Sequence, residues 1–106
     1  MKGGGRKRGM EEWRQKIDAI DDQLLRLLNE RAGCALEIGA IKKGLRLPVY
    51  SAEREMEILA RVTASSRGPL EKAAILRLFE RIIDESRRLE RLAGQEAEPP
   101  AGGSGE

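Results

Sequence analysis

The most constraining feature of this chain is an apolar stripe between residues 13 and 42. Apolar or small side chains recur there at alternating steps of four and three residues, the spacing of one face of a long helix. The positions are Trp13, Ile17, Ile20, Leu24, Leu27, Cys34, Ile38 and Ile41. Arg31 stands where this alternation requires a hydrophobic residue. Because a guanidinium among apolar side chains costs free energy unless an anion meets it, Arg31 is a candidate ligand-binding residue.

Length and composition indicate one small all-α domain. The chain has 106 residues, of which 36% are charged and only 3% aromatic, a balance typical of amphipathic helices rather than of a β-sheet core. The net charge of +2 argues against a general polyanion binder. The sequence contains no run of 18 or more apolar residues, so it predicts no membrane helix, and its N-terminus shows no signal-peptide pattern. We therefore expect a cytoplasmic protein without membrane association.

The residue inventory also restricts the chemistry. The chain has no histidine, which removes the commonest general base and the commonest metal ligand, and we expect neither metal nor cofactor. The single cysteine, Cys34, lies within the apolar stripe and is interpreted as a small core residue in a reducing compartment.

The first helix is expected to begin near Met10 or Glu11 and to end near Lys43, before the stretch 44–48. Residues 1–9, rich in glycine and basic residues, are expected to form a disordered tail. A helix of more than 30 residues is at least about 45 Å long, and two shorter helices of one chain cannot cover it. We therefore expect an interlocked oligomer, with a second copy of the chain as the cover. Gly33 and Gly39 weaken the helix propensity, and close helix–helix approach would explain them.

Two further helices are predicted. Ser51 is a plausible N-cap for a helix that ends near Ala64. A third helix is expected to start at Pro69 and to end near Leu92. The helical domain then covers residues 10–93, and the Pro/Gly/Glu-rich residues 94–106 are expected to be disordered.

Several polar residues interrupt the apolar faces of these helices. Lys42 lies eleven residues after Arg31, on the same face and roughly 16 Å along the axis. A second group shares one face at the start of the second helix, and a third pair lies one turn apart on the third helix: these are Ser51, Arg54 and Glu55, and Ser86 with Glu90. Each alone is explained by a solvated surface or a local hydrogen bond. Together they suit a pocket for a small dianion.

Arg14 lies seventeen residues before Arg31, about 25 Å away along a straight helix. The two side chains cannot reach one small ligand from the same helix. If Arg14 serves such a pocket, it serves the pocket of the partner subunit.

These polar residues give the chain a resemblance to the all-helical chorismate mutases. Their order and spacing match across three helices, and the surrounding segments match as well, over about residues 10–92. The segments are RQKIDAIDDQLLRLLNER, EIGAIKK, PVYSAEREMEIL and LFERIIDES. The resemblance implies a three-helix protomer with a long first helix, an intertwined homodimer, and rearrangement of chorismate to prephenate on the route to phenylalanine and tyrosine. It implies no metal and no covalent intermediate.

The resemblance also implies a role for each polar residue. Arg14 of the partner subunit, Arg31, Arg54 and Ser86 would bind the two substrate carboxylates. Lys42 would donate to the ether oxygen, Glu55 would accept from the ring hydroxyl, and the backbone N–H of Ser51 would contact that hydroxyl. Ile38, Ile58 and Ile83 would form apolar walls.

Glu90 departs from the many bacterial relatives that place a glutamine at this position. A glutamate donates to the ether oxygen only when it is protonated. Our hypothesis is that Glu90 acts as the neutral acid, so that activity falls as pH rises through its ionisation.

Two other interpretations remain open. An isochorismate-pyruvate lyase uses a related helical scaffold and a similar dianion site. A non-catalytic helical dimerisation or regulatory module would keep the fold without the activity. Binding of nucleic acid would depend on the basic tail alone and is not expected.

Overall fold

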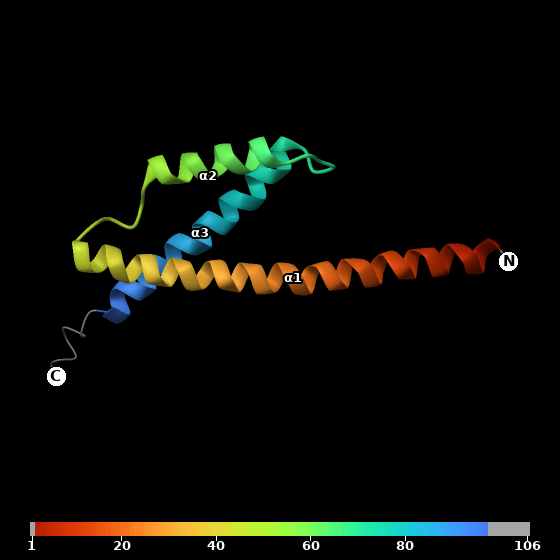
Figure 1. Cartoon of the computed structure of the whole chain (residues 1–106), viewed down its shortest axis with the longest axis horizontal. Helices are drawn as coiled ribbons and strands as arrows, with labels where there is room; N and C mark the ends of the chain where they lie inside the picture. Colours follow the sequence, from red (N-terminus) through yellow and green to blue (C-terminus); the bar gives the residue numbers. More distant parts are fainter. Residues whose placement is uncertain (1, 98–106) are drawn as a thin grey trace. The chain divides into compact units, whose positions relative to one another are not determined.

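The computed structural model describes residues 2–97, with side chains described for 7–95, and this part of the chain is all-α. It contains three helices and no strand: α1 (Lys2–Leu45), α2 (Ala52–Ser65) and α3 (Lys72–Ala97) (Figure 1). The chain divides into two compact units, Met1–Arg31 and Ala32–Glu106, and α1 belongs to both. No helix in the described part is long and apolar enough to cross a membrane.

The helix boundaries match the expected ones closely for α2 and less closely for α1. Ser51 is the N-cap of α2, since its Oγ accepts a hydrogen bond from the backbone N–H of Arg54 at 3.2 Å. Helix α1 begins at Lys2, so residues 2–9 are helical rather than a disordered tail. Extending an existing helix requires no new nucleus, and glycines weaken the extension without preventing it.

Helix α1 ends in a Schellman motif around Arg46. The backbone N–H of Arg46 donates to the carbonyl of Lys43 at 3.2 Å, and that of Leu47 donates to the carbonyl of Lys42 at 2.8 Å. Arg46 has a φ of 57°, the left-handed conformation that this motif requires. The helix thus stops two residues after the expected position, and Pro48 follows where it cannot continue it.

The expectation that Pro69 begins the third helix is wrong. Helix α3 begins at Lys72, and the carbonyl of Glu71 accepts from the backbone N–H groups of Ala74 and Ile75. Glu71 is therefore the capping residue. At the other end, α3 continues to Ala97, past the expected end near Leu92. The rest of the predicted C-terminal tail, residues 98–106, lies outside the described residues.

The unit Met1–Arg31 consists of α1 residues, and its apolar stripe is exposed within the single chain. Trp13 is 66% exposed and Leu24 is 50% exposed, and the other apolar stripe residues of this unit are similarly accessible. Among the described residues of one chain, none covers this face. An exposed apolar face of this length is typical of a protein–protein interface.

The unit Ala32–Glu106 has a small core to which all three helices contribute. Its buried apolar residues are Ala35, Ile58, Ile75, Ile83 and Ala93. Cys34, expected in the core, is exposed. Cys34 belongs to the apolar stripe of residues 13–42, which is exposed in the single chain.

Gly39 on α1 lies directly against the backbone of α3. A Cβ at this position would be 2.5 Å from the carbonyl oxygen of Glu90 and 2.6 Å from its Cα. The prediction of close helix approach is therefore confirmed at Gly39. At Gly33 a Cβ would meet nothing within 4 Å, so the single chain makes no such approach there.

Candidate functional site

Lys42 and Glu90 form an ion pair between α1 and α3. Lys42 Nζ is 2.7 Å from Glu90 Oε1, and the two side chains are only 20% and 13% exposed. Lys42 Nζ also donates to the backbone carbonyl of Val49 at 2.7 Å. Burial of this pair weakens the screening by water, so each charge acts strongly on whatever enters beside it.

Glu90 Oε1 is buried and makes no hydrogen bond of acceptable geometry, although the ammonium of Lys42 is close to it. The short distance is that of an ion pair, while the angle of approach is not that of a hydrogen bond. Both observations hold, and together they leave an acceptor position on Glu90 unfilled. A buried polar atom in this state is costly, and such atoms are often found at functional sites.

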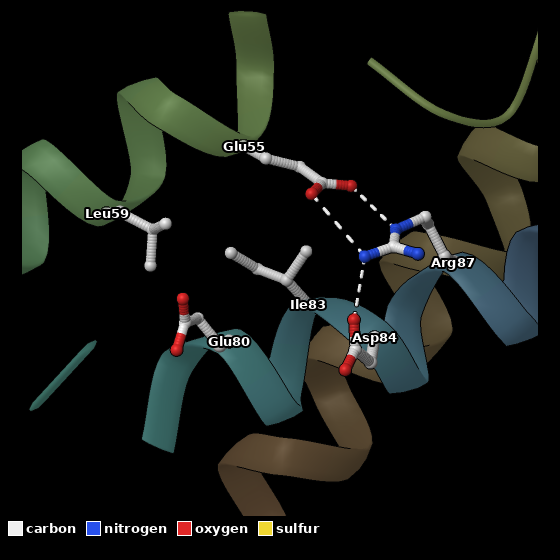
Figure 2. A pocket seen from close by; sticks show the side chains of 6 residues that line it. All are labelled: Glu55, Leu59, Glu80, Ile83, Asp84 and Arg87. Carbon is white, nitrogen blue, oxygen red and sulfur yellow. Dashed lines mark hydrogen bonds and ion pairs between the residues drawn. The ribbon is translucent and has the colours of Figure 1, made fainter. Parts of the chain in front are cut away.

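A second ion pair joins α2 and α3 and was not predicted from the sequence. Arg87 Nε donates to Glu55 Oε2 at 2.7 Å, and Nη2 donates to Glu55 Oε1 at 3.5 Å and to Asp84 Oδ1 at 2.7 Å. Figure 2 shows the guanidinium directed at both carboxylates. The hydrogen bond with Glu55 raises the pKa of the Arg87 guanidinium above its ordinary value, burial opposes this, and the negative charges of Glu55 and Asp84 add to the rise.

These residues line a pocket of about 320 Å³ between α2 and α3. Its walls combine two apolar side chains with four charged ones, and all six are drawn in Figure 2: Glu55, Leu59, Glu80, Ile83, Asp84 and Arg87. Ile83 was predicted as an apolar wall, and it is buried beneath this pocket. Arg87 was detectable in the sequence by the argument used for Arg31, since it lies one turn after the buried Ile83.

Two of the predicted residues make local contacts within their own helices. Arg54 Nη1 is 3.3 Å from Glu57 Oε1 in an ion pair whose arginine side chain is 61% exposed. Ser86 Oγ donates to the carbonyl of Ile82 at 3.0 Å, one turn back. An exposed arginine gains most from water and a neighbouring carboxylate, and a helical serine commonly bonds its own backbone.

Arg14 and Arg31 belong to the unit Met1–Arg31. Arg31 is half-buried and Arg14 is exposed. Their contribution to a site with Lys42 and Glu90 stays a prediction. Among the described residues, no three histidine, cysteine, aspartate or glutamate side chains are grouped so that they could hold a metal ion.

The fold and the two partly buried ion pairs between helices place the chain among small helical proteins with a polar site between helices. Residues 13–91 match the family model described as chorismate mutase type II, so the chain belongs to this family.

The bifunctional chorismate mutase/prephenate dehydratase of Aquifex aeolicus is 37% identical over 86 residues, which are 77% of this chain and 24% of that protein. The chain thus spans about a quarter of the length of this relative. The solved chorismate mutase of Thermus thermophilus is 38% identical, with a TM-score of 0.76 over 77% of this chain and 93% of the other. The chorismate mutase of Helicobacter pylori, solved in complex with prephenate, is 32% identical, with a TM-score of 0.75 over 82% and 94%.

Proposed function

We propose that this protein is a chorismate mutase that converts chorismate to prephenate. The observation that carries the proposal is the partly buried Lys42–Glu90 pair, within a chain of the chorismate mutase type II family. The relative from Helicobacter pylori was solved with prephenate, and the likeness extends over most of both chains. Lys42 is a fixed donor, and Glu90 Oε1, which makes no hydrogen bond, would donate to an ether oxygen placed beside it only in its protonated form.

The reaction breaks one C–O bond and forms one C–C bond within the same molecule. No proton needs to be transferred to the substrate, and no group leaves it. The protein must hold the substrate in its folded conformer and stabilise the negative charge that develops on the ether oxygen. We assign the donation to this oxygen to Lys42, with Glu90 as the second donor when it is protonated.

The remaining assignments follow the family. We propose that Glu55 accepts from the ring hydroxyl and that the backbone N–H of Ser51 contacts the same hydroxyl. The substrate carboxylates would be bound by arginines and a hydroxyl: Arg31, Arg54, Ser86 and Arg14 of the partner subunit. Arg54 is exposed and paired with the neighbouring Glu57 in this structure, so a carboxylate that enters has little to displace.

We propose an intertwined homodimer as the active form. The exposed apolar stripe of Met1–Arg31 supports it, because a second copy offers an apolar face of the same length. The same pairing would bring Arg14 of one chain to the site of the other. The expected cytoplasmic location stays a prediction.

The proposal is tested by following the loss of chorismate and the formation of prephenate with the purified full chain. Turnover without added metal or cofactor is expected. Isochorismate is tested as a second substrate. Release of pyruvate from isochorismate, with no formation of prephenate from chorismate, would make the protein a lyase. A folded dimer that turns over neither compound would contradict the proposed function.

A further inference from the structure

Arg87 is held on three sides at the edge of the proposed site. Its guanidinium contacts Glu55 on α2 and Asp84 on α3, and its Cζ lies 5.6 Å from the centre of the Tyr50 ring, which precedes α2. The Arg87 side chain is 27% exposed and that of Glu55 is 20% exposed. A half-buried guanidinium with three partners is fixed in position, unlike a solvated surface charge.

The surroundings of Glu55 make this arginine necessary. The pocket wall also carries the carboxylates of Glu80 and Asp84, and Arg87 is the one cation among the described residues that line it. Without Arg87, like charges would repel the partly buried carboxylate of Glu55, and desolvation would disfavour its present position. The side chain would then turn away towards water.

The two contacts with Glu55 are unequal. Oε2 accepts the short bond from Nε at 2.7 Å, whereas Oε1 receives only the long contact from Nη2 at 3.5 Å. Nη2 is committed instead to Asp84 at 2.7 Å. Oε1 therefore keeps acceptor capacity for another hydroxyl.

We propose that Arg87 is a positioning residue that fixes the Glu55 carboxylate so that Oε1 accepts the ring hydroxyl of the substrate. This inference rests on the proposed function. It adds to the site a charged residue that acts on the substrate only through Glu55. The bound hydroxyl changes little during the rearrangement, so its interaction contributes to substrate binding more than to the chemical step.

The test is a double-mutant cycle with R87M and E55Q, measured as kcat and KM for chorismate. In the background that keeps Glu55, we expect R87M to raise KM about tenfold and to change kcat by a smaller factor than KM. In the E55Q background, R87M should change KM less than about twofold, because Arg87 then has no carboxylate to position. R87K keeps the charge but not the two-pronged contact, so its effect should lie between those of wild type and R87M.

R81M is the matched control. Arg81 also pairs with an acidic residue on α3, Glu85, at 2.8 Å, but its side chain is 75% exposed, so its loss should leave KM unchanged. Equal effects of R87M in both backgrounds would show a purely structural role and would overturn the inference, as would an unchanged KM. If R87M does not fold, R87K in the two backgrounds decides by the same comparison. No turnover of chorismate by the wild type would instead refute the proposed function itself.

Discussion

Gly39 leaves no room for a side chain because the backbone of Glu90 lies against it. The Cβ of an alanine would be 2.5 Å from the Glu90 carbonyl oxygen and 3.0 Å from the Ala93 Cβ. The contact is with backbone, which cannot move aside as a flexible side chain does. The glycine therefore sets the distance between α1 and α3, and with it the distance between Lys42 and Glu90.

Replacing Gly39 with alanine is expected to destabilise the protein by about 1–3 kcal/mol, because overpacking outweighs the better helix propensity of alanine. The measurement is urea unfolding at one fixed protein concentration, since a dimer's stability depends on it. Gly44 is the control, because a Cβ there meets nothing within 4 Å. Its alanine variant should be neutral or more stable by up to about 1 kcal/mol. Equal stability of the two variants would contradict the packing account.

Lys42→Ala is expected to lower kcat by several orders of magnitude while the oligomeric state stays unchanged. The variant removes the partly buried donor that we place at the ether oxygen, where its hydrogen bond is strongest in the transition state. Steady-state kinetics and light scattering provide the two measurements. Lys72→Ala, at an exposed position at the start of α3, serves as the control. A loss below roughly tenfold, about 1.4 kcal/mol, would mean that the role of Lys42 is misassigned.

The pH dependence of Glu90→Gln tests whether Glu90 donates as a neutral acid. A glutamine donates at every pH, whereas a glutamate donates only below its ionisation. For the wild type, kcat/KM should fall as pH rises and Glu90 loses its proton, and for the glutamine variant this fall should be absent. Profiles of the same shape would exclude this role for Glu90.

Leu24→Lys is expected to convert the proposed dimer into monomers or to prevent folding to a stable state. Leu24 is 50% exposed in the single chain and lies in the middle of the apolar stripe. Two buried ammonium groups at a symmetric interface would cost more free energy than the contact provides. Size-exclusion chromatography with light scattering measures the mass. Gln23→Lys is the control at the neighbouring exposed position. A wild-type monomer would refute the dimer outright.

Ser51→Ala separates helix capping from substrate binding. The hydroxyl caps α2, so its loss should cost about 0.5–2 kcal/mol of unfolding free energy. The proposed contact to the substrate comes from the backbone N–H, which alanine keeps, so KM should change little. Thermal unfolding and chorismate kinetics measure the two effects. Ser65→Ala is the control, because Ser65 Oγ only donates back to Arg61 in an exposed turn. A large rise in KM would show that the hydroxyl itself binds substrate.

Local chemistry in the sequence predicted most of the secondary structure. Ser51 indicated the start of α2 because its side chain satisfies a backbone N–H that the helix leaves free. Pro69 suits a helix start equally well, and only the hydrogen bonds to Glu71 decide the true position. The start of α1 at Lys2 was not predicted, because the glycines and basic residues of 1–9 suggested disorder. Adding these residues to the end of an existing helix costs little free energy, since no new nucleus is needed.

The candidate site was predictable where a polar residue interrupts an apolar face. Lys42 and Glu90 satisfied this criterion, and the structure brings them together. Arg87 satisfies it too, but two of its partners, Glu55 and Tyr50, lie on other segments of the chain, which the spacing along one helix does not reveal. Arg54 was predicted in the same way, but it pairs with Glu57 on its own helix, and the spacing of polar residues does not distinguish such a local pair from a site residue.

Under the role that we propose for Lys42, its bond to the carbonyl of Val49 makes the position of its ammonium depend on the connection between α1 and α2. Any residue that keeps the backbone conformation can stand at position 49, so a comparison of side chains would overlook it. An insertion between residues 46 and 50 would move this carbonyl and release the ammonium from one of its two tethers. The length of this connection is thus under the same constraint as the lysine, whereas its composition is free to drift.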